Sequence, residues 1–296
     1  PYSVESSASG VEKTVTEKDR IWYRRKFTLN EDFAGKRTML NFEAVDWQCS
    51  VWVNSKLIGE HTGGYNPFSF DITDALVDGE NELVVKVFDP TDEGHQQRGK
   101  QVQQTHGFWY TATSGIWQTV WMEPVPSSSI NSYYAVSDID SGTLAVSVDA
   151  ALADGDIVEV VLLADGVPVV EAEGREVILH VPDMKLWSPS DPYLYDIEIK
   201  VVSDGAIVDS VKGYAAMRKI SYARDEDGHK RMLLNNKPLF QYGPLDQGWW
   251  PDGLYTAPSD EALAFDIEKT KEMGFNLIRK HVKVEPARWY WHCDRL

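Results

Sequence analysis

Cysteine is scarce in this chain, and that scarcity limits what can hold the fold together. Among the 296 residues there are only two cysteines, Cys49 and Cys293, in different regions of the sequence. A disulfide framework needs several cysteines at short, regular spacings, so the sequence predicts two buried thiols instead. The fold must therefore depend on hydrophobic cores, and the chain is long enough for two domains or more.

Positive charge is also in short supply. The sequence has 29 Lys and Arg against 46 Asp and Glu, a formal net charge of −17. Such a balance repels phosphate backbones, which argues against nucleic acid as a partner. A solvated acidic surface accounts for most of this charge.

Long apolar runs are missing as well. No run approaches the roughly 18 residues that a membrane span needs, so no membrane partner is predicted. Residues 1–20 lack the basic-then-apolar order of a signal peptide, and no compartment is assigned. The seven histidines are scattered without ligand-like spacing. The sequence therefore predicts no metal and no other cofactor.

Aromatic residues, in contrast, are plentiful, with 11 Trp and 13 Tyr. Aromatic faces stack on the C–H faces of sugar rings, and proteins that handle carbohydrate often carry many of them. Aromatic side chains also fill the cores of β domains, which is their commoner use. Composition alone leaves both interpretations open.

Residues 1–126 show the pattern of a β-sandwich of the jelly-roll kind. The stretch "IWYRRKFTL" alternates large and polar residues as a half-buried strand does. Further short strands are separated by turns at Asn54-Ser55 and Asp78-Gly79. Short, evenly spaced strands indicate a sandwich. A long polar stretch at residues 90–115 interrupts them, and it is predicted to be a surface loop of a kind that often carries binding function.

Residues 127–220 form a second β pattern. About seven alternating strands are separated by turns such as Asp165-Gly166 and Asp204-Gly205, which is typical of an immunoglobulin-like sandwich. This region has no cluster of residue types that carry catalysis. A spacer is the predicted role.

Residues 221–296 change to alternating strand and helix signals. The apolar run Leu239–Tyr242 predicts a short strand, and Ser259 predicts the start of a helix that Gly274 ends. The stretch "FNLIRK" then predicts a second strand. Strand–helix repeats of this kind begin a parallel α/β sheet or barrel. A (β/α)8 barrel takes about 250 residues, so this region is expected to be its truncated start.

Several motifs together resemble glycoside hydrolase family 2, which includes β-galactosidases, β-glucuronidases and β-mannosidases. They are "WYRRKF" at 22–27, "VWVNSKLIGEHTGGYNPFSFDIT" at 51–73, "SGIWQTVWMEPVP" at 114–126 and "GFNLIRKHVKVEPARWYWHCDRL" at 274–296. The last resembles the family signature through Asn276, Arg279, His281, Pro286, Trp289 and Asp294. The resemblance covers nearly the whole chain.

The resemblance implies the N-terminal part of a retaining exo-β-glycosidase that hydrolyses terminal β-linked sugars. A β-galactosidase is the first expectation, with an oligosaccharide or glycoside as substrate; a homo-oligomer is left open. The family's two catalytic glutamates lie on later barrel strands. They are expected beyond residue 296, so this fragment should contain no catalytic residue and should be inactive.

Five residues are candidates for substrate binding. They are Asp246, Trp249, Trp250, Arg279 and His281. By resemblance Arg279 orients a catalytic carboxylate, although a rim salt bridge is an equally common role. Asp246 and His281 would bind sugar hydroxyls, or be a solvated turn Asp and an ordinary loop His. The tryptophans would stack on a sugar or pack between domains. Many members place the His three residues after the Arg. Here it follows by two, which on a strand turns the side chain to the other face.

The rival interpretation is a non-catalytic, multi-domain carbohydrate-binding protein. Two sandwiches and many aromatic residues would serve that role too. Residues 221–296 distinguish the two, because a binding module has no use for strand–helix repeats that carry Asn276 and Arg279.

Overall fold

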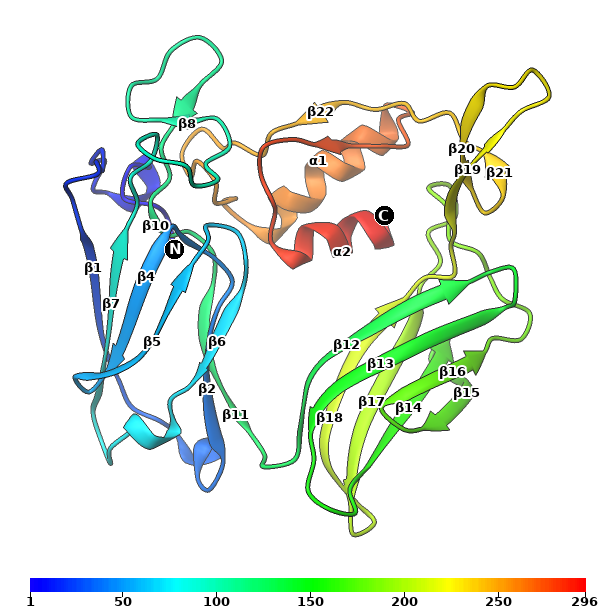
Figure 1. The fold of residues 1–296 in the computed structure, drawn as a ribbon, viewed down its shortest axis with the longest axis horizontal. Coiled ribbons are helices and arrows are strands. Elements are labelled where there is room, and N and C mark those ends of the chain that lie inside the picture. Colours follow the sequence, from blue (N-terminus) through cyan, green and yellow to red (C-terminus); the bar gives the residue numbers. More distant parts are fainter. The chain divides into compact units, whose positions relative to one another are not determined.

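A computed structural model describes all 296 residues. It divides the chain into two compact units: residues 1–124 with 243–290, and residues 125–242 with 291–296. Strands dominate both units, and the two α-helices are α1 (Asp260–Glu272) and α2 (Ala287–Arg295) (Figure 1). Neither helix is long and apolar enough to cross a membrane. The mainly β architecture predicted from the sequence is confirmed.

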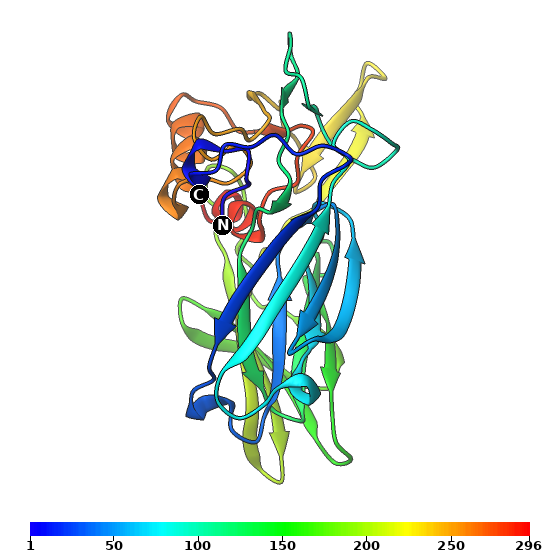
Figure 2. The same cartoon turned by 90° about the vertical axis from the view of Figure 1, so that its left-hand side faces the viewer.

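The first unit contains two facing sheets with a shared apolar core. One sheet has the order β1-β7-β4-β5 and the other β11-β2-β6, and Figure 2 views the unit from the side of β1 and β7. The bounds are β1 (Ile21–Phe27), β2 (Arg37–Phe42), β3 (Val45–Asp46), β4 (Gln48–Val53), β5 (Lys56–Thr62), β6 (Phe68–Asp71), β7 (Asn81–Phe88), β8 (Gln101–Val102), β9 (Tyr110–Thr111), β10 (Gly115–Ile116) and β11 (Val120–Val125). The core between the sheets includes Phe42, Val51, Val85 and Val87.

The hairpin between β4 and β5 shows how local sequence sets the fold. Asn54 and Ser55 have φ values of 48° and 66°, as the two central residues of a type I′ turn require. The Asn54 side chain donates to Ala75 O at 2.8 Å and to Asn81 Oδ1 at 2.7 Å. The turn predicted at this position is confirmed.

The second unit is a seven-stranded sandwich followed by a separate sheet of three strands, in the order β19-β20-β21. Its two sheets have the orders β12-β13-β16 and β15-β14-β17-β18. The bounds are β12 (Ser129–Asp138), β13 (Thr143–Ala151), β14 (Ile157–Ala164), β15 (Val167–Glu173), β16 (Glu176–His180), β17 (Tyr195–Ser203), β18 (Ala206–Ala215), β19 (Ile220–Arg224), β20 (Lys230–Leu234) and β21 (Lys237–Pro238). At the start of β17, the Tyr195 hydroxyl accepts from Lys185 N at 2.7 Å. This tyrosine corner is typical of immunoglobulin-like sandwiches.

Residues 243–290 pair two short parallel strands, β22 (Leu245–Asp246) and β23 (Arg279–Lys280), with α1 between them in sequence. Ser259 caps α1 by accepting from Ala262 N at 3.2 Å. Gly274 follows the helix with φ of 85°, a conformation that glycine adopts without strain. The helix predicted from these signals is confirmed.

The strand predicted at Leu239–Tyr242 was wrong. These residues form no strand, and Phe240 is 83% exposed. The parallel strand instead begins at Leu245, after Pro244 accepts from Arg279 N at 2.9 Å. A short apolar run does not by itself show which residues will pair with another strand. Here the pairing with β23 determines that the strand is Leu245–Asp246.

Candidate functional site

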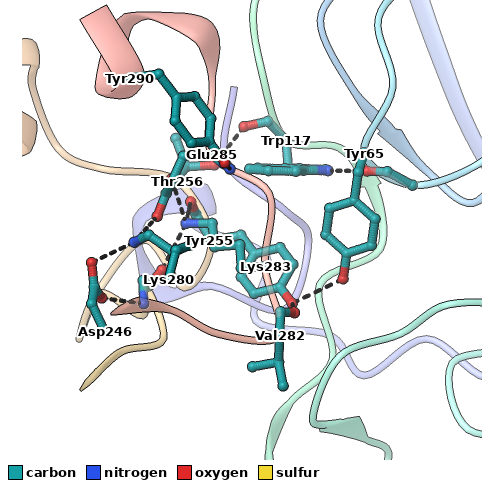
Figure 3. A network of polar contacts seen from close by, with 12 residues as sticks. Tyr65, Trp117, Asp246, Tyr255, Thr256, Lys280, Val282, Lys283, Glu285 and Tyr290 are labelled. Atoms are coloured by element: carbon teal, nitrogen blue, oxygen red, sulfur yellow. Dashed lines mark hydrogen bonds and ion pairs between the residues drawn. The ribbon is translucent and has the colours of Figure 1, made fainter. Parts of the chain in front are cut away.

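The candidate site lies in the first unit, in the loops that follow β22 and β23. Asp246 ends β22, and its Oδ1 accepts from Gly248 N at 2.7 Å. Its carboxylate also pairs with the Lys280 ammonium (Figure 3). Its backbone oxygen accepts from His281 N at 2.8 Å. Asp246 therefore ties its own loop to the end of the neighbouring strand.

Lys280 begins a buried chain of alternating charges. Its ammonium lies 2.8 Å from Glu285 Oε1, and Lys283 Nζ lies 3.0 Å from Glu285 Oε2. The Lys283 and Glu285 side chains are 0% and 2% exposed. Buried charges of this kind are tolerated only when they are paired and hydrogen-bonded. The charges of the chain balance, because Lys280 and Lys283 face Asp246 and Glu285.

Lys283 is the most deeply buried member of this chain. Its ammonium donates to Gly248 O and to Tyr255 O, both at 2.7 Å (Figure 3). It also lies 4.9 Å from the centroid of the Tyr255 ring. Burial lowers the pKa of Lys283 to about 8, while Glu285 opposes that shift. With two carbonyls and a carboxylate around it, this ammonium holds the loops in place and has no open side for a substrate.

An aromatic cluster joins these loops to the long loop of residues 90–115. Trp249 stacks on Tyr110 of β9, with ring centroids 4.3 Å apart and an interplanar angle of 15°. On its other side it contacts Tyr255 at 4.5 Å. The Tyr255 hydroxyl lies 3.1 Å from the Tyr65 hydroxyl and donates to Val282 O at 3.3 Å (Figure 3). The long loop is thus part of the wall around the candidate site.

Gly99 permits the closest approach between the two segments. It has φ of 60°, and a Cβ there would meet Val282 O and lie 2.8 Å from the Tyr255 hydroxyl. Only glycine fits such a conformation and such a distance without strain. The long loop is therefore fixed on the candidate site by sterics as well as by stacking.

The loop after β22 holds three buried polar atoms without a hydrogen-bond partner: Gln247 Oε1, Trp249 Nε1 and Trp250 Nε1. Buried polar atoms are nearly always paired, so each exception needs an explanation. Together they offer one acceptor and two donors within four residues. Hydroxyl groups, which both donate and accept, are a suitable partner for this set.

Comparison with known proteins assigns this chain to a family. Residues 8–126 match the model of "Glycosyl hydrolases family 2, sugar binding domain", and residues 127–218 match that of "Glycosyl hydrolases family 2". The chain belongs to glycosyl hydrolase family 2. The two matched ranges follow one another directly and cover well over half of the chain.

Individual relatives of this family 2 chain include two kinds of enzyme. It is 26% identical over 301 residues to a β-galactosidase of Thermoanaerobacter pseudethanolicus, covering 93% of this chain and 38% of the relative. It is 28% identical to a β-glucuronidase of Bacteroides fragilis, covering 87% of this chain and 39% of the relative. The chain thus spans little more than a third of the length of these relatives.

Solved structures share the fold. The crystal structure of Ruminococcus gnavus β-glucuronidase superposes with a TM-score of 0.80 at 23% identity. The match covers 93% of this family 2 chain and 48% of that chain. At this identity the likeness speaks for the architecture alone.

The five residues singled out in the sequence fall into separate places of this family 2 chain. Asp246 is engaged by Lys280, Trp249 lies in the aromatic cluster, and Trp250 forms a bridge with Leu254. Arg279 is exposed. It precedes Lys280 on the same strand, so its side chain points to the opposite face. His281 is linked to Asp246 through its backbone only. The structure therefore places Asp246 and Trp249 together in the loop after β22, but it leaves the Arg279 side chain on the opposite face of β23.

Sequence reasoning missed the buried charges that organise these loops. Lys280, Lys283 and Glu285 lie within the six residues "KHVKVE". A short segment that holds two lysines and a glutamate just before Pro286 was a usable signal. Whether they would be buried depended on Gly248 and Tyr255, which are distant in sequence.

One group of side chains has the spacing to hold a cation. Ligand atoms of Asp225, Asp227 and His229 lie within 4.8 Å of one another in the turn between β19 and β20. Asp225 is already paired with Arg231 at 2.7 Å, and the other two are exposed. Exposed acidic turns are common, and nothing else in the structure directs a metal to this one.

Proposed function

We propose that residues 1–296 are the N-terminal part of a retaining exo-β-glycosidase that removes terminal β-linked sugars. In this proposal residues 1–126 form the jelly-roll domain, residues 127–220 the immunoglobulin-like spacer and residues 221–296 the start of a (β/α)8 barrel. Family membership supports the glycosidase, since the relatives named above are β-galactosidases and β-glucuronidases.

One observation carries the proposal. The loop that follows the first parallel strand holds three unpaired polar atoms and stacks through Trp249 on Tyr110 of the jelly-roll loop. In α/β barrels, loops at the carboxyl ends of the strands form the active site. A pocket built there would receive one wall from the barrel and one from the long loop, which suits recognition of a chain end.

The roles of the candidate residues follow from this position. The indole N–H groups of Trp249 and Trp250 are the proposed donors for sugar hydroxyls, and Asp246 and His281 shape the same rim. Arg279 is exposed on the other face of β23, where its charge would keep a catalytic carboxylate ionised. That carboxylate and its general-acid partner, about 5–5.5 Å apart in retaining enzymes, belong in this proposal to residues beyond 296.

A β-galactoside is the proposed substrate class, because β-galactosidases are prominent among the relatives. β-Glucuronides are the second candidate, since relatives of similar identity are β-glucuronidases. The two sugars differ in charge at C6, so an assay that compares them separates the candidates.

The test uses the protein encoded by the complete reading frame and a panel of aryl β-glycosides. We expect turnover of the β-galactoside, with the anomeric configuration of the first-formed product retained in an NMR time course. Arg279→Ala should lower kcat/KM by about 100-fold or more, as loss of a positioning group near the reacting atoms does. Tyr222→Ala, at a 73% exposed residue of β19, is the control and should have no effect. Residues 1–296 alone should show no turnover.

The rival function gives different results. If the reading frame adds no further strand–helix repeats, and the protein binds oligosaccharides without hydrolysing any aryl glycoside, it is a carbohydrate-binding protein. Turnover by residues 1–296 alone would instead show that the catalytic pair is misplaced here.

A further inference from the structure

The outer face of the β1-β7-β4-β5 sheet differs from a simple solvated surface. Successive side chains of a strand point to opposite faces, and here the inward ones, such as Val51 and Val85, build the core. On the outward face Trp22 pairs with Lys86, Lys86 with Ser50, and Ser50 with Glu60. These four residues form one continuous row across all four strands.

One aromatic ring is exposed on this face, beside two that are half-buried. Trp22 is 59% exposed, and its ring lies near-parallel to that of Trp52, with centroids 6.0 Å apart and an interplanar angle of 26°. In the next row the guanidinium of Arg20 lies 3.9 Å from the centroid of the Phe88 ring. Aromatic side chains grouped on a rigid sheet offer flat apolar faces on which a ligand ring can stack.

A hollow of about 270 Å³ lies beside these rings, lined by Arg20, Gln48, Ser50, Glu60, Lys86 and Phe88. This volume is near the lower limit for ligand pockets, which suits one sugar unit. Lys86 Nζ lies 5.8 Å from the centroid of the Trp22 ring. A substituent of a hexose stacked on Trp22 would therefore reach this ammonium.

The cations around the hollow favour an acidic ligand. Arg24 and Lys26 on the same face are paired with Glu82 and Glu80. Lys86 forms no ion pair with any carboxylate, and Arg20 donates only to backbone oxygens, of Glu17 at 3.2 Å and Asp19 at 2.6 Å. Two cations without a carboxylate partner stand together in a chain of net charge −17.

We propose that this face of the jelly roll is a non-catalytic binding site for an oligosaccharide that carries a uronate. The sugar ring stacks on Trp22, and its carboxylate lies between Lys86 and Arg20, where charge-assisted hydrogen bonds are strongest. Glu60, which already accepts from Ser50 Oγ at 2.8 Å, and Gln48 take neighbouring hydroxyls. The site does not depend on the proposed catalytic function, because it lies on a different surface of the first unit.

The test is calorimetric titration of residues 1–296 with an oligosaccharide that contains glucuronate, and with a neutral galacto-oligosaccharide of equal length. We expect millimolar or tighter binding of the acidic sugar, at least fivefold weaker binding of the neutral one, and further weakening by salt. Trp22→Ala should lower the affinity for the acidic sugar at least tenfold. Lys86→Gln should lower it about fivefold, while Lys86→Arg keeps it.

A matched control is available in the same domain. Trp121 is a 41% exposed tryptophan on β11 of the opposite sheet, and Trp121→Ala should leave binding unchanged. Trp22→Phe keeps an aromatic face, so partial binding in that variant shows that the loss in Trp22→Ala is not a loss of folding. No binding at 10 mM sugar, equal losses in the Trp22 and Trp121 variants, or equal affinity for both sugars would each overturn the proposal.

Discussion

The interiors of the two units differ in kind. In the second unit no Asp, Glu, Lys or Arg is buried, and the sandwich core consists of residues such as Leu162, Ile197 and Ile199. The first unit buries Asp46, Asp89, Lys283 and Glu285 as well as an apolar core. Burying charge costs several kcal/mol per ion unless partners compensate. A domain that serves only as a scaffold does not need buried charged groups. Their presence in the first unit alone indicates that this unit is built around a site, whereas the second unit is built for stability.

The two sets of buried charges in the first unit are compensated differently. Lys283 and Glu285 neutralise each other within 3.0 Å. Burial raises the pKa of Asp46 well above its usual range, and nearby Asp89 adds to that shift. Burial likewise raises the pKa of Glu5 to about 7. The raised pKa values favour the neutral, protonated form of these two acids, whereas Lys283 and Glu285 face each other as an ion pair.

Breaking the Lys–Glu pair should have the largest effect. Lys283→Met removes one of the two cations that face the buried Glu285 and leaves two carbonyl oxygens without a donor. We expect the free energy of unfolding of the first unit to fall by about 4 kcal/mol, measured by urea denaturation. Lys26→Met, which removes the 57% exposed partner of Glu80, is the control and should cost less than about 1 kcal/mol. Similar effects in both variants would mean that burial of this pair does not matter.

An apolar cavity should have the largest effect in the second unit. Leu162 is fully buried on β14, so Leu162→Ala is expected to cost about 3 kcal/mol. Ile178→Ala, at a 67% exposed position of β16, should change stability by less than about 1 kcal/mol. The transition of the first unit should not move in either variant. If it did, the two units would not unfold separately, and the comparison between them would lose its basis.

The raised pKa of Glu5 predicts that the stability of the first unit depends on pH. The pKa of Glu5 is raised from 4.5 to about 7 in the folded chain, so the folded state binds a proton that the unfolded state has released. Its stabilising effect is complete below pH 4.5 and is lost as the pH rises to 7. We expect the first unit to lose about 2 kcal/mol over this range. Glu5→Gln should flatten the profile, and an unchanged slope in that variant would assign the dependence to other groups.

The smallest predicted effect concerns the tyrosine corner. Tyr195→Phe removes the acceptor for Lys185 N but keeps the buried ring, so the cost should be about 1 kcal/mol in the second unit. Thermal unfolding measures this loss of stability. The control is Tyr222→Phe, a change at an exposed tyrosine. A loss as large as that of Leu162→Ala would show that this corner has a role beyond one hydrogen bond.

Local features of this fold could be predicted from the sequence. The Asn54-Ser55 turn and the Ser259 cap each depend on a few adjacent residues, and both were found where expected. The order of two sandwiches was visible because alternation and turn residues repeat over each region. All of these features depend on residues that are close together in the sequence.

Long-range features of the site could not be predicted in the same way. Lys283 is held by Gly248 and Tyr255, and their distance along the sequence hides the contact. Arg279 was chosen and Lys280 was missed, although they are adjacent, because the face that each one occupies is set by the pairing of β22 with β23. The stacking of Trp249 on Tyr110 depends on the whole fold of the long loop.

The first unit is discontinuous in sequence, and this has a consequence for its synthesis. Residues 1–124 are separated from residues 243–290 by residues 125–242 of the second unit, roughly 120 residues. At ribosomal rates of about 5–20 residues per second, the second stretch emerges some 6–24 s after the first. During that interval Tyr65, Trp117 and Tyr110 have been made but lack the partners that Tyr255 and Trp249 provide. The nascent chain therefore exposes an aromatic surface for many seconds, and a chaperone that recognises such surfaces would find this protein at that stage.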